Sequence, residues 1–366
     1  MNISTVTNCY GCMACIDICP KQCIQHKKDS LGNIYPSVIQ SDCVDCGACT
    51  KNCPSINKIT LHTPNVIWAA WKKDKTEKAE SSSGGIAAAL SEQIIREGGI
   101  VYGCAFIPPF SFKHIRCESL CELNSLKGSK YVQSDMTGIY KQIKSDLKDN
   151  KKVLFIGTPC QTAAVNLFFK SKNSNLFTID LVCHGAPSSQ ILKDSIPESV
   201  QIKTFNKIKF REQANYHFSI INNDSILYER KLNKDLYLKG FFTSLFNRDS
   251  CYRCQYAQKQ RNSDITLGDF WGVNNKVIPF SVKEGVSLCM INTEKGNNLL
   301  NAVAIKIEKT QRPINEAIEN NEPLNKPAPF KLRSQIFKTL YPIIGFKWGV
   351  ILSIPEIILK NIIIRK

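Results

Sequence analysis

Cysteines crowd the first sixty residues of this chain. Nine of its 17 cysteines lie there, in the stretches NCYGCMACIDICPKQCI and DCVDCGACTKNCPSI. Grouped thiolates are the usual ligands of iron–sulfur clusters and of structural zinc. The first eight residues contain no basic stretch followed by an apolar run, so we expect no signal peptide. The cysteines should therefore stay reduced and available to metal.

The spacing of these cysteines favours two 4Fe-4S clusters. Each stretch separates four cysteines by two, two and three residues and ends in Cys-Pro. In bacterial ferredoxins such a run gives three thiolates to one cluster and sends the fourth to the other. The pattern assigns each cluster its own ligands: a first set of Cys9, Cys12, Cys15 and Cys53, and a second set of Cys19, Cys43, Cys46 and Cys49.

Zinc is the alternative, because two C-x2-C pairs can form a four-cysteine zinc site. Two complete runs that each end in Cys-Pro favour clusters over zinc. Cys23 fits neither set, and we expect it to be a small buried side chain. Residues 1–60 as a whole resemble the two-cluster bacterial ferredoxin domain, which passes single electrons and does no substrate chemistry.

Strands and helices alternate from Val66 onward. Strands are predicted at 66–71, 100–106, 151–157 and 176–183, and helices at 83–99, at 137–150 and after Pro159. This alternation predicts a largely parallel sheet covered on both faces. Aromatic and β-branched residues at 202–212 and 216–230 predict antiparallel strands, followed by a helix at 233–246 and a strand at 264–272.

The predicted fold class is therefore mixed, α+β and α/β. A small ferredoxin-like two-cluster domain occupies residues 1–60. A larger mixed α/β domain, with a largely parallel sheet plus antiparallel strands, occupies residues 65–330, and an apolar and basic tail occupies residues 331–366.

Four later cysteines stand where a site is expected. Cys160 and Cys183 follow predicted parallel strands, and open α/β sheets place their sites at the carboxyl ends of such strands. Cys251 and Cys254 form a separate C-x2-C pair in SCYRCQYA. Each cysteine alone is more often a small buried side chain than a ligand. Together these four, the third set, would complete a third cluster, and a zinc site stays open as the alternative.

Several motifs occur in the order found in one known family. They are SSSGGIAAAL, KGSKYVQS, GTPCQ, DLVCHG, SCYRCQYA and SDITLGDFWG, and they cover roughly residues 65 to 290. Over this region the chain resembles the coenzyme F-420 hydrogenase/dehydrogenase beta-subunit family, in the bacterial branch with a ferredoxin domain at its front. Plant 7-hydroxymethyl chlorophyll reductase is a more distant relative. The resemblance implies FAD beside a 4Fe-4S cluster held by the third set.

The resemblance also implies a flavin site on two motifs. In SSSGG the residues are Ser82, Ser83, Gly84 and Gly85, at a predicted helix start where free N–H groups and the helix dipole favour phosphate. An ordinary glycine-rich helix cap is the alternative. In GSKYVQS the residues are Lys130, Tyr131 and Gln133, with Lys130 as the phosphate or flavin-ring partner. No G-x-G-x-x-G follows a strand, so a Rossmann dinucleotide site is not indicated.

The charge of the chain is strongly basic, with 48 lysines and arginines against 31 acidic residues and a net charge of +17. Such a surface suits an acidic electron carrier such as ferredoxin or flavodoxin, and it equally suits anionic lipid. Nucleic acid ranks last, because no binding motif for it accompanies the charge. No run of eighteen apolar residues occurs, so we expect no membrane-spanning helix and a cytoplasmic protein. The tail at 331–366 could lie on a membrane surface or pack on the protein body.

These observations predict an iron–sulfur flavoprotein oxidoreductase. Electrons would pass between a one-electron carrier, the clusters and FAD, and on to an organic two-electron acceptor, or in reverse. The alternatives are a non-catalytic relay subunit for a partner enzyme and a protein that uses its clusters only for stability or sensing. The resemblance further suggests a small-molecule, sugar or lipid-linked substrate connected with surface polysaccharides. The catalytic residues, the substrate, use of the deazaflavin coenzyme and the oligomeric state stay open.

Overall fold

An eight-stranded mixed sheet forms the centre of the larger domain in this computed structural model, which describes residues 2–170, 173–213 and 215–356. Its middle strands are parallel, and antiparallel strands flank them on both sides. The strands lie in the following order across the sheet: β13 (Ile307–Arg312), β3 (Val66–Lys72), β12 (Ser287–Ile291), β11 (Ile265–Asp269), β7 (Leu176–Leu181), β6 (Val153–Gly157), β4 (Ile100–Ile107) and β5 (Ser111–Cys117).

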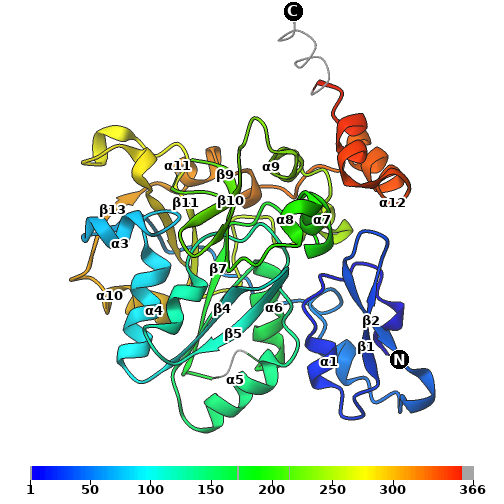
Figure 1. Ribbon diagram of the computed structural model, residues 1–366. Coiled ribbons are helices and arrows are strands. Elements are labelled where there is room, and N and C mark those ends of the chain that lie inside the picture. Colours follow the sequence, from blue (N-terminus) through cyan, green and yellow to red (C-terminus); the bar gives the residue numbers. More distant parts are fainter. Residues whose placement is uncertain (1, 171–172, 214, 357–366) are drawn as a thin grey trace, which may run out of the picture.

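Helices cover both faces of this sheet (Figure 1). The strands in its middle are apolar and almost wholly buried, as expected for strands covered on both faces. The helices of the larger domain are α3 (Lys75–Ala79), α4 (Ile86–Arg96), α5 (Ile139–Lys148), α6 (Pro159–Phe168), α7 (Ser189–Asp194), α8 (Glu198–Gln201), α9 (Leu236–Phe242), α10 (Glu294–Asn301), α11 (Ile314–Glu319) and α12 (Leu332–Ser353).

A three-stranded antiparallel sheet lies beside the main one, formed by β8 (Lys207–Lys209), β9 (His217–Asn222) and β10 (Ser225–Lys231). It shares an aromatic core with α9 and α12, in which Phe246 packs on Phe337 with ring centroids 5.4 Å apart. Part of the predicted tail is therefore helix α12, packed on the body. Among the helices that the structure describes, none has the length and apolar composition needed to cross a bilayer.

The small N-terminal domain consists of α1 (Ala14–Ile18), the antiparallel strands β1 (Ile24–Lys28) and β2 (Ile34–Val38), and α2 (Ala48–Lys51). It docks against α5 and α6 (Figure 1). Asp17 accepts hydrogen bonds from the backbone N–H groups of Gly138 and Tyr140, at 2.8 and 3.1 Å, and so caps α5 from the other domain. Because one domain completes a helix of the other, their relative position is set by hydrogen bonds as well as by apolar contact.

The predicted mixed fold is confirmed, and every strand and helix predicted between residues 66 and 272 has a counterpart. The sequence did not predict β5, β12 and β13, which make the sheet antiparallel on its flanks. The parallel centre follows from strand–helix alternation, whereas the flanking strands pair through contacts that local pattern does not encode.

Candidate functional site

The first set of cysteines lies where the small domain meets the larger one, with Cys9 half-buried and the other three buried. Burial raises the pKa of Cys15, and the neighbouring thiols of Cys9 and Cys53 raise it further. The pKa of Cys12 is likewise raised by burial and then by Cys15, Cys9 and Cys53. These effects place the four thiols of the first set close to one another, and Cys49 of the second set, which also raises the pKa of Cys15, adjoins them.

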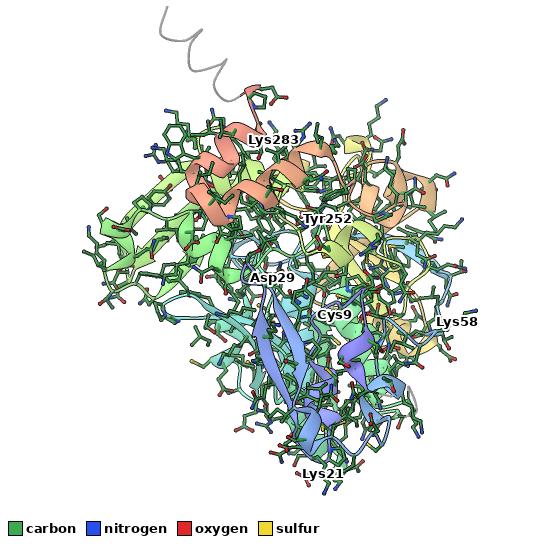
Figure 2. All side chains as sticks on the ribbon, turned by 90° about the vertical axis from the view of Figure 1, so that its right-hand side faces the viewer. Cys9, Lys21, Asp29, Lys58, Tyr252 and Lys283 are labelled. Atoms are coloured by element: carbon green, nitrogen blue, oxygen red, sulfur yellow. The ribbon has the colours of Figure 1, made fainter. Side chains whose placement is uncertain are left out.

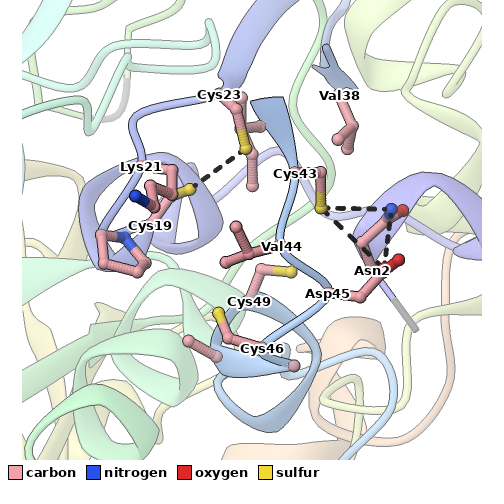
Figure 3. Close-up of a pocket in the computed structure, with 14 residues that line it drawn as sticks. Asn2, Cys19, Lys21, Cys23, Val38, Cys43, Val44, Asp45, Cys46 and Cys49 are labelled. Atoms are coloured by element: carbon pink, nitrogen blue, oxygen red, sulfur yellow. Dashed lines mark hydrogen bonds between the residues drawn. The ribbon is translucent and has the colours of Figure 1, made fainter. Parts of the chain in front are cut away.

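The second set lines a pocket at the outer end of the small domain (Figure 3). Cys46 is exposed and Cys49 is buried, so this set extends from the surface of the domain into its interior. Figure 2 shows Lys21, which lines the same pocket, at the bottom of the molecule, whereas Cys9 of the first set lies near the middle of the view. The second set is thus the one nearer to solvent.

Cys23 also lines the pocket of the second set. Its side chain is 2% exposed, and its Sγ lies 3.5 Å from Sγ of Cys19. Burial raises the pKa of Cys23 to about 11, and its contact with Cys19 adds to the shift. Cys23 is buried, as the sequence predicted, but it packs directly against a cysteine of the second set rather than in a remote part of the core.

The third set comes from three separate segments that meet at one cavity. Cys160 lies in the first turn of α6, Cys183 follows β7, and the other two lie in or next to the 3-10 helix η4 (Asp249–Arg253). Burial raises the pKa of Cys160, and the thiols of Cys254, Cys183 and Cys251 raise it further. The pKa of Cys183 rises to about 12 from burial and from the thiols of Cys251 and Cys254. The four thiols therefore form one group.

Within the described part of the chain, no three or more histidine, cysteine, aspartate or glutamate side chains converge on a position for one metal ion. A zinc ion holds its sulfurs about 2.3 Å from a common centre, whereas a cubane takes one thiolate at each of four irons, and both stay predictions for the third set. Backbone N–H groups also point at two sulfurs, from Gly11 to Cys9 at 3.3 Å and from Gly185 to Cys183 at 3.4 Å. Such donors stabilise the negative charge of a cluster.

Three buried tyrosines lie between the first and third sets. The rings of Tyr10 and Tyr256 are 5.5 Å apart, and both pack beside Cys160 and Cys254. The hydroxyl of Tyr140 donates to the carbonyl of Cys12 at 2.8 Å. Burial raises the pKa of Tyr140, and thiols of both sets add to the shift, Cys12 first among them. The first and third sets are thus neighbours across the domain interface.

Arg248 joins the two domains at this interface. It is 1% exposed, and its guanidinium lies 4.4 Å from the ring of Tyr35. It donates to the carbonyls of Cys9 and Ile34 at 3.4 and 2.7 Å and to the side chain of Gln133 at 2.9 Å. A buried positive charge therefore stands beside the first set.

The third set forms part of the wall of a cavity of about 410 Å³. Two loops that the sequence singled out form another part of its wall, because Ser129 donates its backbone N–H to Ser82 Oγ at 2.9 Å. Gly85 is the N-cap residue of α4 and has no side chain to accept hydrogen bonds from the first turn, and Gly85, Ile86, Ala87 and Ala88 line the cavity. This part of the cavity suits a phosphate.

The predicted flavin residues do not all share one role. Six of them line the cavity: Ser82, Ser83, Gly85, Lys130, Tyr131 and Gln133.

Gly84 is the exception, because it packs against the sheet. A Cβ there would lie 2.3 Å from the carbonyl oxygen of Ala70. The amide of Gln133 is engaged by Arg248 and by the carbonyl of Tyr10 at 2.9 Å, so it serves the domain interface as well.

Lys130 and Tyr131 are held in place by their own surroundings. The Lys130 ammonium donates to the carbonyls of Leu126 and Lys127 at 2.8 Å each, and burial lowers its pKa to about 8. The ring of Tyr131 stacks on Phe241 at 4.5 Å. Lys130 is therefore a half-buried cation beside the cavity and not a solvated loop lysine.

Another part of the cavity wall is aromatic, with Tyr216, Phe242 and Trp271, and Tyr131 of the Lys130 loop contacts Tyr216 and Phe242. Arg211 lies over the ring of Tyr216 at 5.0 Å and forms an ion pair with Asp269. Aromatic side chains next to the Arg211–Asp269 ion pair form a surface on which a flat organic ring can stack.

Sequence reasoning missed several of these residues. Arg261 forms a fully buried ion pair with Asp180 at 3.0 Å and lines the cavity beside Cys183. Asp180 could have been noticed, because a charged residue in a buried strand is rare without a partner. The roles of Arg248, Tyr10 and Tyr256 depend on contacts between domains, and no local pattern marks them.

Comparison with known proteins agrees with these two domains. Residues 8–57 match the family described as 4Fe-4S dicluster domain, and residues 150–316 match the family described as the C terminus of the coenzyme F420 hydrogenase/dehydrogenase beta subunit. The uncharacterized protein MJ1349 of Methanocaldococcus jannaschii is 23% identical over 265 residues, which cover 61% of this chain and 72% of that protein.

A chain of the F420-reducing NiFe hydrogenase complex from Methanosarcina barkeri is similar in structure. It aligns with a TM-score of 0.50 and 20% identity, over 71% of this chain and 86% of that one, which shows a shared fold. The front of the present chain is thus similar to 4Fe-4S dicluster domains, and its residues 150–316 are similar to the C-terminal part of coenzyme F420 hydrogenase/dehydrogenase beta subunits.

Proposed function

We propose that this iron–sulfur electron-transfer protein is a flavin-dependent oxidoreductase with an organic two-electron substrate. One observation carries the proposal: the third set of cysteines lines the same cavity as the Ser82 and Lys130 loops and an aromatic wall. A thiolate group, a phosphate-binding part and an aromatic part in one cavity are the features that a flavin beside a cluster requires. Bound there, 4Fe-4S clusters would supply single-electron transfer and FAD would convert single electrons into pairs.

The residues of this chain fit these groups. Burial and the neighbouring thiols raise the pKa values of Cys160 and Cys183, so a bound metal group would supply the positive charge that stabilises their thiolates. The first turn of α4 would hold the flavin phosphates, and the charge of Lys130, whose ammonium donates to the carbonyls of Ser125, Leu126 and Lys127, would favour them from nearby. Tyr131 and Trp271 supply flat surfaces in the aromatic part of the wall, where they exclude water from a bound ring.

The position of each cysteine set supports an order of electron flow. The second set reaches the surface, the first set is buried at the domain interface, and the third set faces the cavity. A one-electron carrier would therefore approach the outer end of the small domain, and the substrate would enter the cavity. The net charge of +17 favours an acidic carrier such as ferredoxin or flavodoxin.

Iron and flavin content of anaerobically purified protein tests the cofactors. We expect about twelve irons per chain for three cubanes, together with one FAD released by acid. Cys183→Ser should lower the iron content by about four, whereas Ala88→Trp should fill the cavity and remove flavin with iron retained. Ala88→Ser is the matched control and should keep both. About eight irons with one zinc would contradict the third cluster, and absence of flavin would contradict the flavoprotein.

A relay subunit without its own substrate is the second candidate, since the related structure is one chain of a larger complex. Substrate-dependent turnover by the purified chain with a reduced viologen would support the enzyme. Flavin that is reduced and reoxidised only through a partner protein would support the relay. Sugar and lipid-linked compounds are the first substrates to screen, and a deazaflavin is the next.

A further inference from the structure

Helix α12 carries an outward apolar face that its packing on the body leaves uncovered. Its inner face is buried through Phe337, Tyr341, Phe346 and Val350. Its outer face exposes large apolar side chains to solvent: Ile343 at 76%, Trp348 at 56% and Leu352 at 49%. Apolar side chains gathered on one outer face of a helix usually mark an interaction site.

A kink at Gly345 produces this arrangement. Its φ of 75° and ψ of 177° are not helical, so the backbone turns there and continues as a second helical segment. Beyond the kink, Phe346 and Val350 point into the body. Trp348 and Leu352 are four residues apart and therefore share the opposite face. Glycine adopts a positive φ at a lower energetic cost than other residues. The turn at Gly345 therefore lets the chain bury one row of apolar residues while another row is exposed to solvent.

The segment that carries this face is basic in composition, although Lys338 within it is paired with Asp249. Residues 331–366 contain seven lysines and arginines and one acidic residue, Glu356. Lys347 lies 5.8 Å from the ring of its neighbour Trp348, so a cation stands within the apolar face. Residues 357–366, with the sequence IILKNIIIRK, lie outside the described residues and contribute to this count only through their sequence.

We propose that the outer face of α12 docks on an anionic lipid surface. Tryptophan and aliphatic side chains beside lysine are the composition of helices that lie in the membrane interface. A second copy of the chain is disfavoured, because it would bring two basic tails together at one interface. A protein partner is disfavoured because lysine is depleted at protein–protein interfaces. The proposal concerns surface chemistry and does not depend on which cofactors the protein holds.

This docking would leave the electron-transfer surface free. Figure 2 shows α12, the orange-red helix, at the top of the molecule and Lys21, at the outer end of the small domain, at the bottom. The segment that leads into α12 contributes Pro323, Pro327 and Ala328 to the cavity wall. A membrane under α12 would thus lie close to the segment that borders the proposed substrate cavity.

Co-sedimentation of the full-length protein with vesicles tests the proposal. Wild type should bind phosphatidylcholine vesicles that contain phosphatidylglycerol, and binding should weaken as salt rises. The double variant Ile343→Glu/Trp348→Glu should bind about tenfold more weakly, because both side chains would leave the apolar layer. The matched control is Ile202→Glu/Ile305→Glu, since these isoleucines are 85% and 81% exposed elsewhere on the surface.

The control variant should stay within about twofold of wild type, and unchanged iron content and circular dichroism would show that both variants fold. An equal loss in both variants would overturn the proposal in favour of bulk charge, and equal binding to pure phosphatidylcholine would overturn the requirement for anionic lipid. Absence of vesicle binding by wild type would overturn it outright. A dimer that only the α12 variant dissociates would assign the face to a second copy instead.

Discussion

A single buried arginine connects the two domains of this protein. Arg248 contacts the carbonyls of Cys9 and Ile34, the amide of Gln133 and the ring of Tyr35. Its charge lies beside the first set of cysteines, where it favours whichever cluster state is more negative. The residue therefore has two consequences that can be separated: it holds the domains together and it raises a reduction potential.

Arg248→Met should lower the reduction potential of one cluster by an amount on the order of 100 mV, because a buried unit charge beside the first set is lost. Arg248→Lys should leave the reduction potential close to the wild-type value, because the positive charge stays, although some of the hydrogen bonds are lost. Redox titration followed by electron paramagnetic resonance measures both. An Arg248→Met protein with unchanged potentials for every cluster would contradict the electrostatic role, and Arg261→Lys controls for a buried cation near the third set.

At the scale of elements, a buried histidine links β5 to the turn that carries Cys160. His114 Nδ1 accepts from Ser134 Oγ at 2.8 Å, and its Nε2 donates to the carbonyl of Ile156 at 3.0 Å. The amide of Gln161 in α6 in turn donates to Ser134 Oγ at 2.9 Å. This chain of hydrogen bonds ties three elements at the edge of the cavity, and it requires His114 to be neutral.

Burial lowers the pKa of His114 to about 4, below its ordinary value near 6.5. Between these values the unfolded chain binds the proton and the folded protein does not, so stability is present near neutral pH and is lost as pH falls from about 6.5 toward 4. At pH 5 the loss should be about 2 kcal/mol. His114→Gln should remove this part of the acid dependence, which urea denaturation at pH 7 and pH 5 would show. Equal acid dependence in both proteins would contradict it.

Gly84→Ala should destabilise the protein by about 3 kcal/mol, because its Cβ would meet backbone atoms of β3 and of Ser287. Gly128→Ala is the control from the neighbouring loop. Nothing lies within 4 Å of a Cβ there, so only its positive φ of 82° is costly, by about 1 kcal/mol. Thermal unfolding compares the two. A folded Gly84→Ala protein of normal stability that lacks flavin would instead show a direct cofactor role.

At the scale of the whole molecule, the three cysteine sets differ in their access to solvent. Of the cysteines in the three sets, only Cys46 of the second set is exposed to solvent. A chelator or an oxidant should therefore remove the irons of the second set first and those of the first set last. Iron release to a chromogenic chelator should show a fast phase of about four irons. Cys46→Ser should abolish that phase, and release of all irons at one rate would contradict the order.

Whether a feature could be predicted from the sequence depends on how far apart along the chain the interacting residues lie. The grouping of Cys9 to Cys53 and the strand–helix order from Val66 are local, because ligand spacing and hydrophobic period act over a few residues. The antiparallel flanks of the sheet and the outward face of α12 were not predictable in this way. Their residues are ordinary in sequence and gain their role only from what they pack against.

The sequence by itself determined which cysteines could act together: two runs with cluster spacing, and a third set made of two cysteines after strands and one C-x2-C pair. Only the tertiary structure decided what surrounds them. It placed the third set in the same cavity as the Ser82 loop and Arg248 and the tyrosines between the domains. It also showed that Gly84, predicted to bind the cofactor, packs against the sheet instead. The reason is physical: covalent spacing fixes which thiols can share a cluster, whereas burial, charge and access depend on segments that are distant along the chain.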